Sequence, residues 1–340
     1  MKDNPELVKL LLEKGCNMDF RTNMGRTALH WTILQDRTEI AKQLVLAGAS
    51  TEIQDKDGRS ALMLALSFGK LDLAKFIIEA GCPLDAVDKT GLTPLLLSIE
   101  NGYQEIGRML IRKRANLELQ NKEGCTPLMV AVDKGRLGIA RALVRAGCHI
   151  NGRRPKGKET ALNVAIMRAN PGIAKTIVNK GAKLDLRNED GRMPLHLAII
   201  KGQTEIACFL ISHGADLEAR DKDECTPLLL AVRRGNLEVT IVLLSNNADR
   251  LAKGKQGNTP LMIAKENGNG HIIDALNAAR DVERAKKRKA EEQEWVRKME
   301  EEEAKEEARL DAEAKRERER IEAIRRANPI VLQIVSPMLR

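Results

Sequence analysis

One short motif recurs at nearly constant spacing over the first 280 residues, and it constrains the fold more than any other feature. The motif starts with Thr or Ser in seven of eight copies, at Thr27, Ser60, Thr93, Thr126, Thr160, Met193, Thr226 and Thr259. Successive copies lie 33 residues apart, except for one spacing of 34 that places an extra residue just before Thr160. A fixed period of this length predicts a stack of similar units, each contacting mainly its neighbours.

Each unit predicts two helices. The Thr or Ser can cap the start of a first helix with its hydroxyl. Pro occupies the next position in five of the eight copies, where a missing N–H costs nothing. Leu stands two residues after the cap in all eight copies, and a small residue stands five after it in all eight. A second helix follows, with two aliphatic positions four residues apart on one face.

These residues resemble the ankyrin repeat, whose signature is Thr-Pro-Leu-His-x-Ala, and Met193-Pro-Leu-His-Leu-Ala198 differs from it only in the first residue. The resemblance covers about residues 1–280. It implies an all-α solenoid of antiparallel helix pairs, with projecting hairpin loops and a concave face of loop tips and first helices. Residues 1–22 match only a partial repeat, so either this repeat is degenerate or the sequence is a fragment.

The last sixty residues differ in composition, because Ala, Glu, Lys and Arg dominate and neither Gly nor Pro occurs between His271 and Asn328. We expect the last repeat helix to continue as a charged helical rod over 281–327, with a total length of about 85 Å. Val282, Val296, Leu310 and Ile324 recur every 14 residues, so a solvated single helix and a weak coiled coil both stay open. The apolar segment 328–340 can add to a partner's sheet edge, enter a groove or form a loose terminus.

Composition excludes several classes of protein. Aromatic residues make up 2% of the chain, which excludes nucleic-acid modules built on rows of stacked rings. The six cysteines form no metal-ligand spacing and read as reduced thiols of a cytoplasmic or nuclear protein. No nucleotide-binding, protease or kinase motif occurs, so we expect no enzyme, metal or cofactor. For His30 and His196 the resemblance implies a structural hydrogen-bonding role.

Positive charge is concentrated on the repeats. The chain carries a net charge of +9, and residues 280–340 hold 17 basic and 16 acidic residues, so +8 falls on the solenoid. The position eight residues after the cap is usually neutral in the family, yet four consecutive repeats place a cation there. These four cations, Lys134, Arg168, Lys201 and Arg234, are candidate partner-binding residues. The other candidates are Arg233, the long-loop residues Arg153 and Arg154, and Phe68 as an apolar anchor.

Two further charged positions are ordinary for the family. Acidic residues on the incoming arm of each loop are interpreted as solubilising charges that compensate the loop lysines: Asp19, Glu52, Asp85, Glu118, Asp185 and Glu218. The outer position of the second helices is basic in its first six copies and is also ordinary: Lys9, Lys42, Lys75, Arg108, Arg141 and Lys175.

Three functions stay open. The first is a non-enzymatic scaffold or adaptor that binds an acidic protein segment on its basic concave face, with the C-terminal helix as a second contact arm. The second is a structural component of a large cytoskeletal or ciliary assembly. The third is a nuclear adaptor with nucleic-acid contact, suggested by the run Lys286-Lys287-Arg288-Lys289. The basic column can also be a solvated face, and the expected location is the cytoplasm, with cytoskeletal association or the nucleus as alternatives.

Overall fold

In the described part of the chain, short helices alternate with turns and loops, and one long helix follows them. The structure, a computed structural model, describes residues 6, 9–10 and 13–327. Within these residues the single β feature is an isolated antiparallel bridge between Arg153 and Thr160. The chain divides into two compact units, Met1–Leu276 and Asn277–Arg340. The expected apolar segment 328–340 lies outside the described residues.

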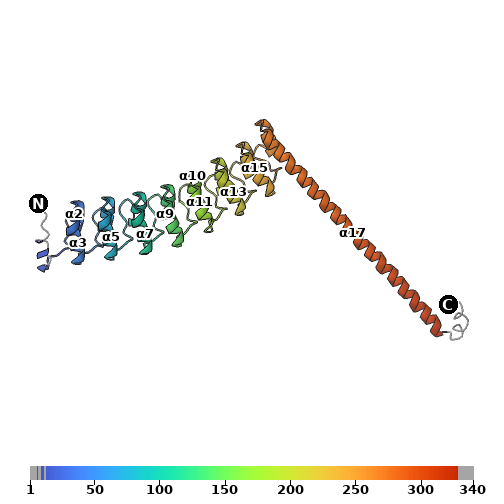
Figure 1. Cartoon of the computed structure of the whole chain (residues 1–340), viewed down its shortest axis with the longest axis horizontal. Coiled ribbons are helices and arrows are strands. Elements are labelled where there is room, and N and C mark those ends of the chain that lie inside the picture. Colours follow the sequence, from blue (N-terminus) through green and yellow to red (C-terminus); the bar gives the residue numbers. More distant parts are fainter. Residues whose placement is uncertain (1–5, 7–8, 11–12, 328–340) are drawn as a thin grey trace. The chain divides into compact units, whose positions relative to one another are not determined.

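The repeats form two rows of helices that lie side by side (Figure 1). The first helices have seven residues each: α2 (Ala28–Leu34), α4 (Ala61–Ser67), α6 (Pro94–Glu100), α8 (Pro127–Asp133), α10 (Ala161–Met167), α12 (Pro194–Ile200), α14 (Pro227–Arg233) and α16 (Pro260–Glu266). The second helices are slightly longer: α3 (Thr38–Leu46), α5 (Leu71–Glu79), α7 (Gln104–Arg112), α9 (Leu137–Arg145), α11 (Pro171–Val178), α13 (Thr204–Ser212) and α15 (Leu237–Ser245). The all-α repeat architecture is therefore confirmed.

The predicted caps start the first helices. In six repeats the Thr or Ser oxygen accepts the backbone N–H three residues later, as between Thr93 Oγ1 and the N–H of Leu96 at 3.2 Å. The two remaining repeats use histidine, because Nδ1 of His30 lies 3.2 Å from the backbone N of Thr27 and Nδ1 of His196 lies 3.4 Å from that of Met193. The far ring nitrogen of His196 lies 3.0 Å from the carbonyl oxygen of Ala219 in the next loop. The structural role expected for both histidines is confirmed.

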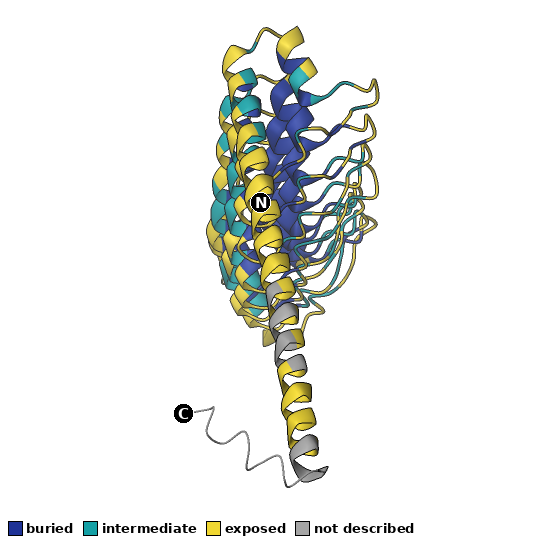
Figure 2. Cartoon of the chain, turned by 90° about the vertical axis from the view of Figure 1, so that its right-hand side faces the viewer, coloured by how far each residue is buried: buried dark blue, intermediate teal, exposed yellow. Residues whose placement is uncertain are grey.

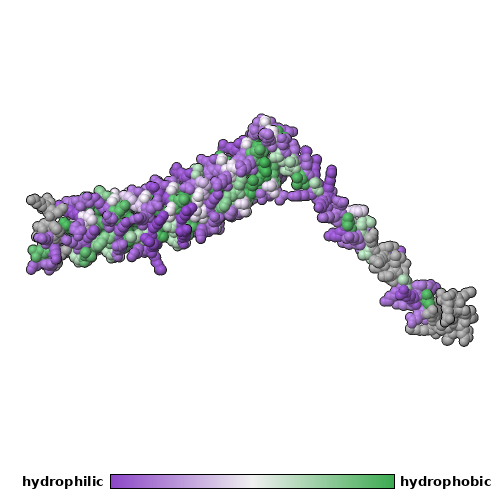
Figure 3. All heavy atoms as spheres, in the orientation of Figure 1, coloured by the Kyte–Doolittle hydropathy of each residue, from purple (hydrophilic) through white to green (hydrophobic). Residues whose placement is uncertain are grey.

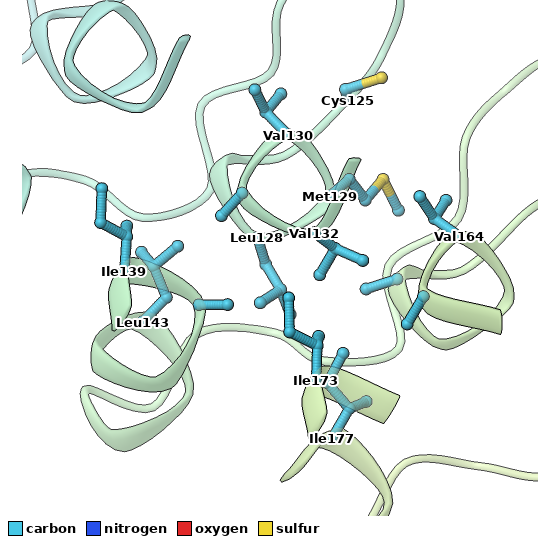
Figure 4. Packing of buried hydrophobic residues seen from close by; sticks show 14 of the residues in the cluster. Cys125, Leu128, Met129, Val130, Val132, Ile139, Leu143, Val164, Ile173 and Ile177 are labelled. Carbon is cyan, nitrogen blue, oxygen red and sulfur yellow. The ribbon is translucent and has the colours of Figure 1, made fainter. Parts of the chain in front are cut away.

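The core is one continuous layer of aliphatic side chains. Figure 2 shows the buried first helices between the half-exposed second helices and the projecting loops. Leu128 of α8, Ile139 and Leu143 of α9, and Ile173 and Ile177 of α11 point into the same layer (Figure 4), and all five are at most 1% exposed. Burying such side chains stabilises by about 1.5–3 kcal/mol each, and the row of small residues lets neighbouring helices approach closely.

A left-handed residue ends each first helix. Glycine supplies it in most repeats, for example Gly102 with φ 78°. Asp36 and Ala169 take the same conformation with φ 60° and 52°, which costs a residue with a Cβ about 1 kcal/mol or more.

The acidic residues on the incoming loop arms connect successive repeats. A carboxylate oxygen of Asp19 accepts the backbone N–H of Ser50 at 2.9 Å, and Glu118 accepts that of His149 at 2.7 Å. Asp85 and Glu218 make the equivalent contacts to Asn116 and Asp249. These four residues therefore have a structural role beyond that of solubilising charges, since each one accepts a backbone N–H of the following repeat.

The extra residue before Thr160 lengthens one loop. Ordinary loops close between residues four apart, as where the N–H of Asp55 donates to the carbonyl of Arg59 at 2.9 Å. In the long loop the N–H of Arg154 donates to the carbonyl of Glu159, five residues on. The insertion is absorbed in the loop, so the helices on both sides keep their places in the stack.

Asn163 is an unsatisfied polar group in the core. It is fully buried, and its side-chain nitrogen and oxygen have no hydrogen-bond partner. Met129 occupies the equivalent position one repeat earlier. We expect Asn163→Met to raise the free energy of unfolding by about 1–2 kcal/mol, because the desolvation cost of the amide is removed. Urea unfolding measures this, and the reverse change Met129→Asn should destabilise. A destabilising Asn163→Met would contradict the assignment.

The last helix, α17 (Gly270–Ala327), has 58 residues, as the absence of Gly and Pro predicted. Ile272 and Leu276, in its first two turns, are 3% exposed and belong to the solenoid core. Farther along, ion pairs such as Glu294–Lys298 at 3.0 Å support the exposed helix. Val282 and Val296 are 55% and 43% exposed. Figure 3 shows hydrophilic residues over most of the visible surface, and no described helix is both long and apolar enough to cross a membrane.

Candidate interaction surface

The basic column lies at the C-terminal ends of the first helices. Lys134, Arg168, Lys201 and Arg234 are the C-cap residues of α8, α10, α12 and α14, and all four are exposed. These four residues are called the basic wall below. Because consecutive first helices pack side by side, the four residues follow one line along the stack.

One member of the basic wall is neutralised within the chain. Nη2 of Arg168 lies 2.9 Å from Oδ1 of Asp133, the last residue of α8, and Nε donates to the same oxygen. Lys134, Lys201 and Arg234 have no carboxylate partner among the described residues. The uncompensated charge is therefore smaller than the sequence suggests.

The two arginines of the long loop have structural contacts. Nε of Arg154 lies 3.1 Å from Sγ of Cys125, and its Nη1 lies 3.3 Å from a carboxylate oxygen of Glu159. Arg153 donates to the carbonyl of Lys158 in its own loop and to that of Arg187 in the next one. Both guanidinium groups thus bind within the fold, so the structure does not bring them to the basic wall.

Arg153 belongs to a row of arginines that clamp successive loops. Arg21, Arg187 and Arg220 occupy the same position in other repeats, and each donates to a backbone carbonyl of the following loop. The arginines at 153, 187 and 220 connect three consecutive loop pairs. A column of arginines at the repeat period was the available sequence signal for this role.

A hollow of about 300 Å³ lies between α12, α14 and the adjacent loop. Its lining includes Ile200, Cys225, Leu230, Arg233 and Arg234. Its two carboxylates already face Arg192, whose Nε lies 3.7 Å from Asp221 and whose Nη2 lies 3.9 Å from Asp223. Arg233 also lines a second hollow of about 410 Å³ toward α16. These hollows put apolar surface beside exposed guanidinium groups.

Phe68 lies far from this hollow. It is the C-cap of α4 and is 50% exposed. Four repeats separate it from Lys201, or about 40 Å at roughly 10 Å per packed helix layer. A compact ligand cannot contact both, so Phe68 stays a candidate only for an extended partner.

No group of three His, Cys, Asp or Glu residues within the described ranges is arranged to hold a metal ion. Burial raises the pKa of the Cys82 thiol to about 11 and that of Cys148 to about 12, so both are protonated and unreactive at neutral pH. Cys16 stands at the equivalent position of the partial first repeat and is exposed.

The two buried histidines predict how stability depends on pH. Burial holds the pKa of His30 and His196 below the ordinary 6.5, so both are neutral in the folded chain. The unfolded chain binds these protons as the pH falls through 6.5, and the folded chain does so only at lower pH. We therefore expect the urea concentration at the unfolding midpoint to decrease as the pH is lowered from 7 toward the pKa values of the folded chain. The double variant His30→Met, His196→Leu should lose this part of the slope, and an unchanged slope would contradict it.

The comparisons with known proteins agree with this architecture. The family model for ankyrin repeats, in three copies, matches residues 1–88, 62–154, 151–221 and 216–285. A comparison with curated proteins finds no match. The matched segments cover the whole stack of helix pairs with its loops, and the chain belongs to the ankyrin-repeat family.

Proposed function

We propose that the protein is a non-enzymatic scaffold or adaptor that binds an acidic segment of a partner protein at the C-terminal end of the basic wall. Ankyrin repeats in general mediate protein–protein interactions. The observation that supports the acidic partner is the hollow beside α14, where Arg233 and Arg234 lie exposed next to Ile200 and Leu230. Lys201 precedes them by one repeat.

This surface fits a peptide that combines carboxylates with apolar side chains. Exposed guanidinium groups can bind carboxylates in bidentate geometry, and cations of one sign along a wall steer an acidic partner toward it. The floor of Ile200 and Leu230 offers an apolar contact. The scarcity of aromatic residues makes a single-stranded nucleic acid the poorer ligand. In this proposal α17 is a second contact arm, and the protein acts in the cytoplasm.

Cross-linking mass spectrometry on cell extract tests the proposal. A lysine-reactive cross-linker should connect the partner's acidic segment to Lys201 or Lys255, since Lys255 lines the neighbouring hollow. Lys113, Lys180 and Lys183, which lie just after the second helices α7 and α11, should not join that segment. Cross-links restricted to these three control lysines would contradict the proposal.

A further inference from the structure

Four arginines form a second basic cluster, on the second helices. Arg108 and Arg112 lie four residues apart on α7, and Arg141 and Arg145 lie four apart on α9. All four line one open hollow of about 900 Å³ with Met109, Ile111 and Ala142. Side chains four apart in a helix begin about 6 Å from each other, and packed helices lie about 8–10 Å apart. The four side chains, called the arginine cluster below, thus start from the corners of a rectangle.

Flanking repeats neutralise the cation at this position. Nζ of Lys75 lies 2.9 Å from a carboxylate oxygen of Glu105, and Nζ of Lys175 lies 2.6 Å from one of Glu205. In both pairs the acid is the second residue of the next second helix. An acidic residue occupies that position in five of the seven second helices from α3 to α15: Glu39, Asp72, Glu105, Glu205 and Glu238.

The two exceptions stand opposite the arginine cluster. The second residues of α9 and α11 are Gly138 and Gly172, one repeat after Arg108 and Arg141 respectively. A Cβ atom at Gly138 would lie 2.6 Å from Nη2 of Arg108, so this guanidinium lies where an acidic side chain would begin. Glycine is a poor helix former and leaves the helix N-terminus without a favourable charge. Both positions thus lack a stabilising residue that the flanking repeats possess.

The arginine cluster consequently has little internal compensation. Glu105 is the one carboxylate in the lining of the hollow, and it already pairs with Lys75. None of the four arginines forms an ion pair with a carboxylate in the part of the chain that the structure describes. The net positive charge of the arginine cluster thus arises from the acidic residues that are absent at Gly138 and Gly172 as well as from the four arginines themselves.

We propose that the arginine cluster is a second protein-docking surface, whose occupant is an acidic helical segment with carboxylates four residues apart. The spacing of such carboxylates along a helix matches that of Arg108 to Arg112 and of Arg141 to Arg145. Guanidinium groups bind carboxylates in bidentate pairs, and the apolar lining residues Met109, Ile111 and Ala142 can contact the aliphatic part of the occupant. The surface lies on second helices, whereas the basic wall lies on first helices, so one chain can hold two partners.

The test restores the missing carboxylates. The probe is a fluorescein-labelled, alanine-based helical peptide of about 20 residues with glutamate at every fourth position. Binding to the full chain is measured by fluorescence anisotropy in the background Lys134→Glu, Lys201→Glu, Arg233→Glu, Arg234→Glu, which removes the unpaired cations of the basic wall and Arg233 beside them. Gly138→Glu with Gly172→Glu is compared with Gly138→Ala with Gly172→Ala, which adds the same Cβ atoms without charge. Neither glycine has a positive φ, so both pairs should fold.

The expected results are specific to the charge. The background variant and the alanine pair should bind the peptide within about two-fold of each other, and the glutamate pair should bind it about 10-fold more weakly. A peptide with glutamine in place of glutamate should not bind. Equal affinity of the glutamate and alanine pairs would overturn the proposal, as would failure of the background variant to bind. Displacement of the peptide by duplex RNA at lower concentration than by unlabelled peptide would also overturn it, in favour of a nucleic acid.

Discussion

Reversing three cations beside the α14 hollow should weaken capture of the acidic partner segment by about 100-fold. The change is Lys201→Glu, Arg233→Glu, Arg234→Glu in the full chain. Each exposed charge contact contributes up to about 1 kcal/mol, and a reversal replaces attraction by repulsion, so three reversals cost roughly 3 kcal/mol. All three side chains are exposed, so the fold should remain intact. Titration of the purified partner segment measures the loss.

A matched variant separates the position of the charges from the net charge. Lys113→Glu, Lys180→Glu, Lys183→Glu makes the same change in net charge at exposed residues that follow the second helices. Its affinity should stay within about three-fold of the unchanged chain, because charges beyond about 8–10 Å are screened at physiological salt. Equal losses in the two variants would show that binding depends only on net charge.

Truncating Leu128 should strongly destabilise the middle of the stack. Leu128 is 1% exposed and points into the layer between α8, α9 and α11 (Figure 4). Leu128→Ala should lower the free energy of unfolding by about 2–5 kcal/mol, because the methyl groups lose their burial and leave a cavity between repeats. Urea unfolding followed by circular dichroism measures the change.

Leu46→Ala is the control for this change. Leu46 ends α3 and is 76% exposed, so its truncation should alter the free energy of unfolding by less than about 0.5 kcal/mol. A Leu128→Ala variant no less stable than the Leu46→Ala variant would contradict the continuous core.

The fold could be predicted from the sequence because each determinant is local and repeated. Thr93 caps the helix that starts next to it, and Leu128 marks the buried face of its own helix. The insertion before Thr160 was visible as a broken spacing, and its effect stays within the loop. The extension of the last repeat into α17 also followed from local composition.

The candidate site was harder to predict, because side-chain partners come from neighbouring repeats. In the sequence Arg168 has no evident acidic partner, whereas in the structure its Nε lies 2.9 Å from Oδ1 of Asp133, 35 residues earlier. Arg153 is held by the carbonyl of Arg187 in the next loop. Arg108 shows the opposite case, since its position is ordinary for the family and only the glycine at 138 leaves it without a partner. A cation that recurs at the repeat period is thus available to a ligand only where no group of a neighbouring repeat already pairs with it.

A charge-swap experiment tests the central claim, that cations at the end of the basic wall hold an acidic protein segment. The triple variant Lys201→Glu, Arg233→Glu, Arg234→Glu is titrated with the partner segment after its carboxylate residues have been changed to lysine. If complementary charge holds the two proteins together, the affinity of the doubly changed pair should return to within about 10-fold of that of the two unchanged proteins. A pair in which only one of the two proteins carries its changes should bind weakly. A swapped pair that binds no better than the single-sided changes would contradict the claim.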